Sequence, residues 1–246
     1  LPQDGYDDSM QKLKNKIYDI NRDTARFFHS FLMSEEGKWA LDYLLGRGLT
    51  LKTIKHFGLG AAPDSWDMLI KHLKEKGYKE ADMLAAGVVG KSQKGTLYDR
   101  FRKRVMFPII NIRGNIIAFS GRAMPGEDKQ GGKYVNTSDT PVYKKSSNLF
   151  GMNFAKNVCS ERVILVEGNM DVISLHQAGF TNAVAPLGTA FTMEQANLRA
   201  RYTKEIVLTL DADAAGQKAI KRASELLENT GLKTRVVVIP DGKDPD

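Results

Sequence analysis

The sequence predicts an α/β protein built in two parts, an α+β part over residues 1–160 and a parallel α/β part over 161–246. Three observations support this fold class. Residues 7–90 carry apolar side chains at helical spacing, residues 88–122 are rich in β-forming side chains, and residues 161–240 alternate apolar strands with helical segments. With 246 residues, the chain is long enough to bury the cores of two modest domains.

Helices dominate the prediction for the first part, after a linker-like start over residues 1–10. A long helix is expected over 7–34, where the apolar positions at helical spacing are Leu13, Ile17, Ile20, Ala25, Phe28 and Leu32. Shorter helices, each closed by Gly or a polar turn, are expected at 35–45, 49–57, 65–77 and 79–87. The candidate N-cap residues of these helices are Ser34, Thr50 and Ser65.

A hairpin is predicted where the composition becomes β-forming. Val105–Phe107 and Ile116–Phe119 flank the sequence Asn-Ile-Arg-Gly-Asn, which is typical of a tight turn. Phe107 and Phe119 are expected in the core. The segment 125–147 is rich in Gly, Lys and Ser with few apolar residues, so exposed loops are expected there.

Four apolar strands separated by helices are predicted in the second part. The strands are expected at 162–166, 182–187, 205–210 and 234–240, with intervening helices through 174–179, from Thr192, and over 214–228. This alternation implies parallel pairing with right-handed crossovers.

The charge of the chain is concentrated in one block. The net charge is +7 and the isoelectric point is near 9.3, but residues 91–160 alone hold thirteen Lys or Arg against four Asp or Glu. Such a block fits either a polyanion partner or a solubilising surface, and charge alone does not decide between them. The single cysteine, Cys159, excludes an internal disulfide and a cysteine zinc site. No apolar run approaches a membrane span and no signal peptide is visible, so a cytosolic protein without a membrane partner is expected.

Carboxylates follow three of the predicted strands. Glu167 follows the first, Asp211 and Asp213 follow the third, and Asp241, Asp244 and Asp246 follow the fourth. Asp171 lies one helical turn beyond Glu167. Because ligands bind at the carboxyl ends of parallel strands, these side chains are expected at one edge of the sheet. Mg²⁺ or Mn²⁺ would neutralise them, and a pair of such ions suits phosphoryl transfer.

Each of these acidic residues also has a purely structural interpretation. Asp213 is a good N-cap, Asp171 complements a helix dipole, and the segment 241–246 suits a surface turn. Taken singly, these interpretations explain all the carboxylates except Glu167 and Asp211.

The arrangement Glu167-Gly168 with Asp171, and Asp211-Ala-Asp213 before Ala-Gly, resembles the Toprim signature of primases, topoisomerases, certain nucleases and recombination mediators. The resemblance extends over nearly the whole chain to the RNA polymerase core of bacterial DnaG-type primases. The segments that carry it are GLGAAPDSWDML at 58–69, YDRFRKRVMFPI at 98–109, SGR at 120–122, KYVNTSDTPVYKKSSNLFG at 133–151, LGT at 187–189 and DGKDPD at 241–246. It implies a Toprim-like sheet in the second part.

The resemblance also implies an activity, which is synthesis of short RNA primers on single-stranded DNA from ribonucleoside triphosphates. Carried over, Glu167, Asp211 and Asp213 are catalytic metal ligands for two or more Mg²⁺ or Mn²⁺ ions, beside Asp171, Asp241 and Asp244. Glu167 is either a ligand or a general base. The residues implied to contact nucleotide and DNA are Arg47, Arg100, Arg102, Arg122, Lys133, Tyr134, Asn136 and Lys145. Among the aromatic residues, Tyr134 and Tyr143 are expected to stack on bases.

Two features depart from the family pattern. Asn169 stands where the family usually has an aromatic residue, which puts a stacking role there in doubt. The family's zinc-binding and helicase-binding domains are not present, so the chain is expected to be a fragment without zinc, whose replicative helicase partner binds through a missing C-terminal domain. The implied location is the bacterial cytoplasm, on the nucleoid at replication forks.

Two other classes of function share the acidic signature. A Toprim nuclease would use the same metal site to cleave DNA without nucleotides, and a non-catalytic module would bind DNA independently of the metal ligands. A topoisomerase also requires a nucleophilic tyrosine in a further domain. The basic segment from 98 to 145 favours the primase alternative.

Overall fold

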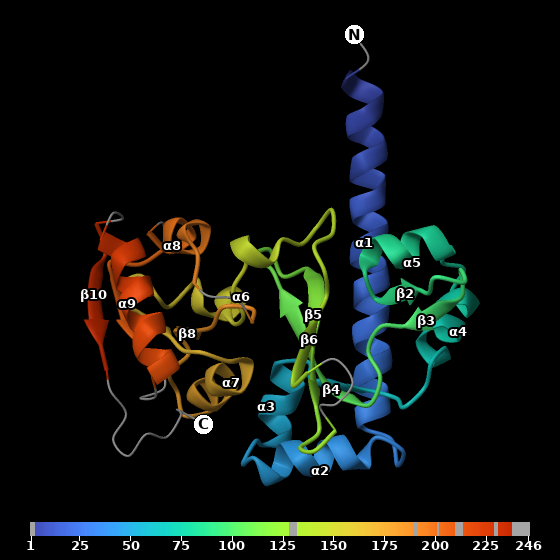
Figure 1. Cartoon of the computed structure of the whole chain (residues 1–246), viewed down its shortest axis with the longest axis horizontal. Coiled ribbons are helices and arrows are strands. Elements are labelled where there is room, and N and C mark those ends of the chain that lie inside the picture. Colours follow the sequence, from blue (N-terminus) through green and yellow to red (C-terminus); the bar gives the residue numbers. More distant parts are fainter. Residues whose placement is uncertain are drawn as a thin grey trace. The chain divides into compact units, whose positions relative to one another are not determined.

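The computed structural model describes residues 3–127, 132–188, 191–200, 202–209, 214–228 and 231–237. The chain forms two compact units, Leu1–Ile109 with Asn115–Tyr143, and Ile110–Gly114 with Lys144–Asp246 (Figure 1). The sequence places the boundary near residue 160. The segment from 144 to 160 packs with the second unit because Phe150 forms a bridge with Ala185, and Gln195 donates hydrogen bonds to the carbonyl oxygens of Lys145 and Asn148.

The longest helix of the first unit is α1 (Gln3–Leu32), drawn in dark blue in Figure 1. The expected linker over 1–10 is wrong from residue 3, because the helix already begins there. Its apolar stripe is buried as predicted, with Ile17, Ile20, Phe28 and Leu32 inaccessible or nearly so. The other helices are α2 (Lys38–Gly46), α3 (Leu51–His56), α4 (Met68–Glu75) and α5 (Glu80–Ala86), and α2, α4 and α5 contact α1.

One of the three predicted N-caps is confirmed. Thr50 precedes α3 and its hydroxyl accepts from the Thr53 amide at 3.2 Å. Ser34 and Ser65 also accept backbone bonds, but the N-cap positions of α2 and α4 are held by Gly37 and Asp67.

A four-stranded sheet of order β1-β4-β5-β6 packs with α1. Its strands are β1 (Gly60–Ala62), β4 (Arg104–Ile110), β5 (Ile116–Ala123) and β6 (Tyr134–Asn136), and β2 (Val89–Lys91) pairs with β3 (Leu97–Asp99) separately. The predicted turn between β4 and β5 is confirmed, since Gly114 has a φ of +87° and its amide donates to the Asn111 carbonyl. Phe107 and Phe119 are buried as expected. Strand β6 lies in the segment for which exposed loops were predicted.

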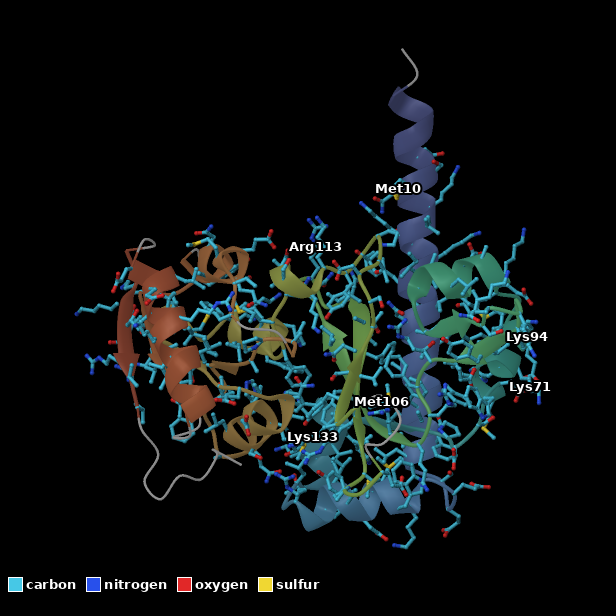
Figure 2. The ribbon with its side chains drawn as sticks, viewed as in Figure 1. Met10, Lys71, Lys94, Met106, Arg113 and Lys133 are labelled. Atoms are coloured by element: carbon cyan, nitrogen blue, oxygen red, sulfur yellow. The ribbon has the colours of Figure 1, made fainter. Side chains whose placement is uncertain are left out.

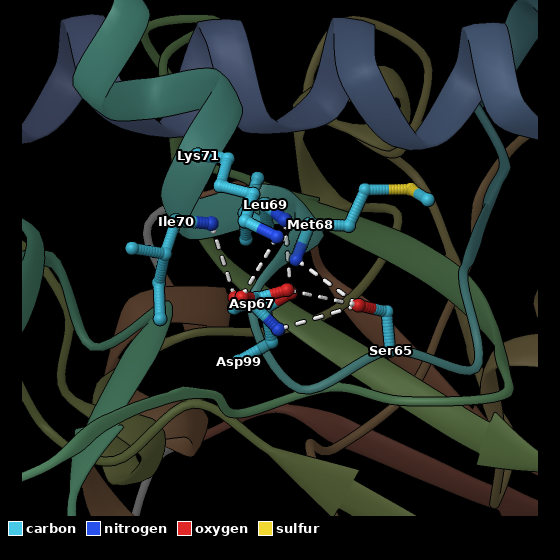
Figure 3. Close-up of polar contacts among 7 residues, drawn as sticks. All are labelled: Ser65, Asp67, Met68, Leu69, Ile70, Lys71 and Asp99. Carbon is cyan, nitrogen blue, oxygen red and sulfur yellow. Dashed lines mark hydrogen bonds and ion pairs between the residues drawn. The ribbon is translucent and has the colours of Figure 1, made fainter.

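The first amides of helix α4 are bound by a carboxylate that is distant from the helix in sequence (Figure 3). Asp99, at the end of β3, is 2% exposed and accepts from the amides of Leu69 at 2.8 Å and Ile70 at 3.1 Å. Burial raises the pKa of Asp99, although the two amide bonds oppose that shift. Asp99 therefore satisfies two of the amides that the start of a helix leaves unpaired.

Asp99→Ala is expected to lower the free energy of unfolding by roughly 2–3 kcal/mol, because two buried amides lose their acceptor. Urea denaturation measures this loss. The matched control is Asp67→Ala, which removes an exposed carboxylate that pairs with Lys71 and Ser65 at the same helix end. The control is expected to cost less than about 1 kcal/mol. Equal losses in the two variants would contradict this role for Asp99.

The second unit is built on a parallel sheet, which confirms the predicted fold class. Its strands are β7 (Val163–Leu165), β8 (Ala183–Val184), β9 (Glu205–Leu208) and β10 (Lys233–Val236), in the order β10-β9-β7-β8 and all parallel. The helices that alternate with them are α7 (Asn169–Gln177), α8 (Met193–Ala200) and α9 (Ala214–Glu228). Before them lie the short 3-10 turn η1 (Lys145–Ser147) and α6 (Met152–Ala155).

The core of the second unit uses the apolar residues of these strands, including Val163, Leu165, Ile206 and Leu208. Cys159 belongs to this cluster and is buried, as the sequence suggested. Among the described residues, no helix combines the length and the apolar character that crossing a membrane requires.

Candidate active site

Among the described residues, the carboxyl edge of the parallel sheet presents one exposed acidic residue. Glu167 follows β7, which lies between β8 and β9 in the sheet, and its side chain is exposed. A carboxylate that is accessible at the end of an inner parallel strand can ligate a divalent cation or accept a proton. The role of Glu167 at the metal site stays a prediction.

Asp171 has a structural task at the same edge. It is 7% exposed, and its Oδ2 accepts from the Gly168 amide at 2.8 Å, which ties the loop after β7 to the first turn of α7. This contact supports the structural interpretation of Asp171, in which it stabilises the first turn of a helix. A carboxylate has further lone pairs, so the contact leaves Asp171 able to approach a cation as well.

The other predicted metal ligands, Asp211, Asp213, Asp241 and Asp244, lie outside the described residues. Within the described part of the chain, no group of three or more His, Cys, Asp and Glu side chains has a geometry for holding a metal ion. The predicted metal set therefore stays a prediction. Two of its members, Glu167 and Asp171, are placed at one sheet edge.

Asn169, the position where the sequence departs from the family pattern, is 7% exposed in the first turn of α7. Because almost none of this side chain reaches the surface, the structure gives it no accessible face for stacking on a base.

In the first unit, four of the predicted contact residues have no carboxylate partner among the described residues. They are Arg100, Arg102, Arg122 and Lys133, the last labelled in Figure 2. The neighbouring Lys103 differs from them, because its ammonium group forms an ion pair with Glu127 at 2.7 Å. An unneutralised arginine or lysine keeps its charge for an anionic ligand.

Arg100 and Asn136 are brought together at β6. The Arg100 guanidinium donates to the Ser138 hydroxyl at 2.6 Å and to the Asn136 carbonyl at 3.5 Å. Arg122, on β5, lies opposite Tyr134 in the ladder and donates to its hydroxyl at 3.4 Å. Arg47, at the C-terminal end of α2, donates to the Tyr43 hydroxyl at 3.2 Å.

A pocket of about 440 Å³ in the first unit, called the basic pocket below, has a lining in which cations outnumber carboxylates. The cations are Arg100, Arg102, Lys103 and Arg104, the carboxylates are Asp64 and Glu127, and Trp66 also lines it. The Arg102 guanidinium lies 3.8 Å from the centroid of the Trp66 ring, and Trp66 is 62% exposed. Trp66 was not predicted as a functional residue. The available signal was a tryptophan at the start of a predicted helix, within a segment that resembles the primase core.

The remaining predicted contact residue, Lys145, belongs to another part of the fold. Lys145 lies in η1 of the second unit, where Gln195 donates to its carbonyl oxygen at 3.3 Å. Next to it, Glu194 accepts from the hydroxyls of Ser146 and Ser147, so α8 fixes the segment that carries Lys145.

The expectation that Tyr143 stacks on a base is wrong. Tyr143 is 1% exposed, and burial raises the pKa of its hydroxyl. The turn that carries it folds back through backbone bonds between Thr140 and Tyr143, which places the ring inside the unit. Tyr134 is half-buried and keeps part of its ring accessible.

Family models match both parts of the chain. A model described as the N-terminal domain of the DNA primase catalytic core matches residues 27–156, and a Toprim-like model matches residues 164–246. The boundary expected near residue 160 falls between these two ranges.

The chain is similar to several bacterial DNA primases. It is 44% identical over 233 residues to that of Clostridium acetobutylicum, covering 94% of this chain and 38% of that protein. It is also 44% identical over 243 residues to that of Pseudomonas aeruginosa, covering 96% of this chain and 36% of that protein. The chain thus spans less than half the length of these relatives.

Solved structures resemble the chain closely. The RNA polymerase domain of Mycobacterium tuberculosis primase DnaG matches with a TM-score of 0.88 at 35% identity, covering 94% of this chain and 77% of that one. A DnaG primase catalytic domain bound to single-stranded DNA matches with a TM-score of 0.85 at 35% identity, covering 96% of this chain and 77% of that one.

Proposed function

Because the chain belongs to the family of DNA primase catalytic cores, we propose that it is the part of a bacterial primase that joins ribonucleotides into short primers on single-stranded DNA. The observation that carries the proposal is the set Arg100, Arg102, Arg122 and Lys133, which has no carboxylate partner among the described residues. Cations that are left unneutralised favour a polyanion partner over a merely solubilising surface. The relative solved with single-stranded DNA supports the choice of template.

The chemistry proposed is nucleotidyl transfer, in which a ribonucleotide 3′-hydroxyl attacks the α-phosphate of an incoming triphosphate. Glu167, Asp211 and Asp213 are the proposed ligands of Mg²⁺ or Mn²⁺, with Asp171, Asp241 and Asp244 beside them. When bound, such ions lower the pKa of the attacking hydroxyl and stabilise developing charge. The exposed Glu167 carboxylate fits either ligation or acceptance of the hydroxyl proton.

The basic residues supply positioning and charge neutralisation. Arg122, Lys133 and Lys145 are proposed to hold the triphosphate and the departing pyrophosphate, which carry the charge that develops during transfer. Arg47, Tyr134 and Asn136 complete the contact set. The Gln195 bonds to the segment around Lys145 fix that segment, as a positioning role requires.

We place the template strand along the basic pocket of the first unit. Trp66 offers an exposed ring on which a base can stack, while Arg100 and Arg102 face the phosphates. The contact of Arg102 with Trp66 holds the ring and the charge side by side. In the cell, the template and nucleotides are met at replication forks on the nucleoid, and a replicative helicase is the expected partner of the longer protein.

Trp66→Ala is expected to weaken binding of a labelled oligodeoxythymidylate by roughly tenfold to a hundredfold, because one base loses a stacking surface worth about 1–3 kcal/mol. Fluorescence anisotropy over a salt series measures this. The dependence on salt is expected to stay as it is in the parent chain, since no phosphate contact is removed, whereas Arg102→Ala is expected to reduce it. Met68→Ala, an exposed apolar residue two positions further along the chain at the start of α4, is the control. Unchanged affinity in Trp66→Ala would exclude this path.

A nucleotide-dependence assay tests the proposed function against the nuclease alternative. The chain is incubated with circular single-stranded DNA and a divalent cation, with and without ribonucleoside triphosphates. A primase core leaves the DNA intact and forms RNA only when nucleotides are present. Loss of the DNA without nucleotides would support the nuclease instead.

A further inference from the structure

Tyr43, in the last turn of α2, contacts two arginines of the proposed nucleotide and DNA site. Its hydroxyl accepts from the Arg47 guanidinium at 3.2 Å, and the centroid of its ring lies 5.4 Å from the central carbon of the Arg122 guanidinium. Arg47 lies one helical turn beyond Tyr43, whereas Arg122 comes from β5 in a distant part of the sequence. One side chain therefore connects two cations that the chain brings from different elements.

Arg122 is held by aromatic groups rather than by a carboxylate. Tyr134 lies opposite it in the β5–β6 ladder, with its ring centroid 5.7 Å from the guanidinium carbon. Tyr43 supplies a second ring within the range of a cation–π contact. Over the described residues, no Asp or Glu forms an ion pair with Arg122. Two rings orient this guanidinium without cancelling its charge, as a phosphate-binding arginine requires.

A simpler interpretation is that Tyr43 only fills space beside α2, since it is half-buried. That interpretation explains the ring but not the position of the hydroxyl, which accepts a bond from Arg47. It also predicts that phenylalanine would serve equally well. The two interpretations therefore differ in what removal of the hydroxyl alone should do.

We propose that Tyr43 is a positioning residue that holds Arg47 and Arg122 in a fixed relation, so that both contact the same phosphate-bearing ligand. The inference rests on the proposed function, because it takes both arginines as phosphate contacts. The hydroxyl acts on Arg47 and the ring acts on Arg122. The phosphate oxygens belong either to the incoming triphosphate or to the template strand, and separate measurements distinguish these two sources.

The test compares Tyr43→Phe and Tyr43→Leu in the background of the parent chain, of Arg47→Ala and of Arg122→Ala. Extension of an RNA primer annealed to DNA gives kcat and the KM for nucleotide, and anisotropy gives the Kd for single-stranded DNA. Tyr43→Phe is expected to raise the KM or the Kd by about threefold to tenfold, which corresponds to the net contribution of one typical hydrogen bond. Tyr43→Leu is expected to raise the same constant further. A change in KM assigns the phosphate to the nucleotide, and a change in Kd assigns it to the template.

A double-mutant cycle separates positioning from general damage to the fold. The effect of Tyr43→Phe is expected to vanish when Arg47 is already alanine, and the additional effect of Tyr43→Leu is expected to shrink when Arg122 is alanine. Tyr18→Phe, a half-buried tyrosine on α1, is the matched control and should change neither constant.

Two results would overturn the inference. One is that both Tyr43 variants lower the melting temperature but leave KM and Kd unchanged. The other is that the loss in Tyr43→Phe persists undiminished in the Arg47→Ala background. If Arg47→Ala and Arg122→Ala themselves leave both constants unchanged, the proposed function of these arginines fails rather than the link through Tyr43.

Discussion

Asp211→Asn is expected to abolish ribonucleotide incorporation while leaving the fold intact. Asparagine keeps the size of the side chain and removes one negative charge from the proposed metal set. Because bound divalent ions contribute several kcal/mol to stabilising the transferred phosphoryl group, the loss in rate is expected to reach at least about a thousandfold. Asp211 follows the last residue of β9 by three positions, beyond the described residues, so this prediction rests on the family resemblance.

Primer extension at saturating nucleotide measures this loss, with the circular dichroism spectrum and the melting temperature as checks on the fold. The matched control is Asp19→Asn, which neutralises an exposed carboxylate of α1 that pairs with Arg22. The control should retain full activity. A yield from Asp211→Asn within tenfold of the parent chain would remove Asp211 from the metal site.

Arg122→Ala is expected to produce the second largest effect, a rise of roughly tenfold to a hundredfold in the KM for nucleotide or in the Kd for DNA. The physical reason is that Arg122 has no carboxylate partner in the described part of the chain, so removing it leaves a bound phosphate without its counter-charge. If the phosphate belongs to DNA, the slope of log affinity against log salt should fall by about 1. Kinetics and anisotropy over a salt series measure both quantities.

Two further variants sharpen this prediction. Arg122→Lys keeps the charge but loses the planar group that faces the two tyrosine rings, so only part of the affinity should return. Lys71→Ala is the control, because Lys71 is exposed and already paired with Asp67 at 3.0 Å. Arg122→Ala behaving like Lys71→Ala would show that Arg122 does not contact phosphate.

The second unit could be predicted almost element by element. Its strands β7 and β9 are buried apolar runs, and the helices between strands leave only parallel pairing as a solution. The short strands of the first unit were not predicted, because a strand of three residues is too short to show the alternation of apolar and polar side chains. Strand β1 even begins with Gly60, a poor strand former. There the backbone lies against α1 so closely that a Cβ on Gly60 would be 2.6 Å from the Cβ of Phe28.

The sequence names candidate residues for the site but does not show which side chains contact them. The resemblance to a family names Arg122 and Arg102, while their partners Tyr43 and Trp66 come from segments far away in the sequence. The same holds for Asp99, which stabilises the start of α4 across a gap of thirty residues. For Tyr143 the prediction itself was wrong. The polar, Gly-rich sequence around it predicted an exposed side chain, whereas the fold of the turn buries the ring.

The most direct test of the central claim is extension of an RNA primer annealed to a DNA template of defined sequence, using the chain, Mg²⁺ or Mn²⁺ and all four ribonucleoside triphosphates. An existing primer removes the separate step of initiation, so the assay reports on nucleotidyl transfer alone. The account predicts ribonucleotides added in an order complementary to the template, and no addition when the metal is chelated. An RNA product unrelated to the template, an unextended primer, or degradation of the DNA would contradict it.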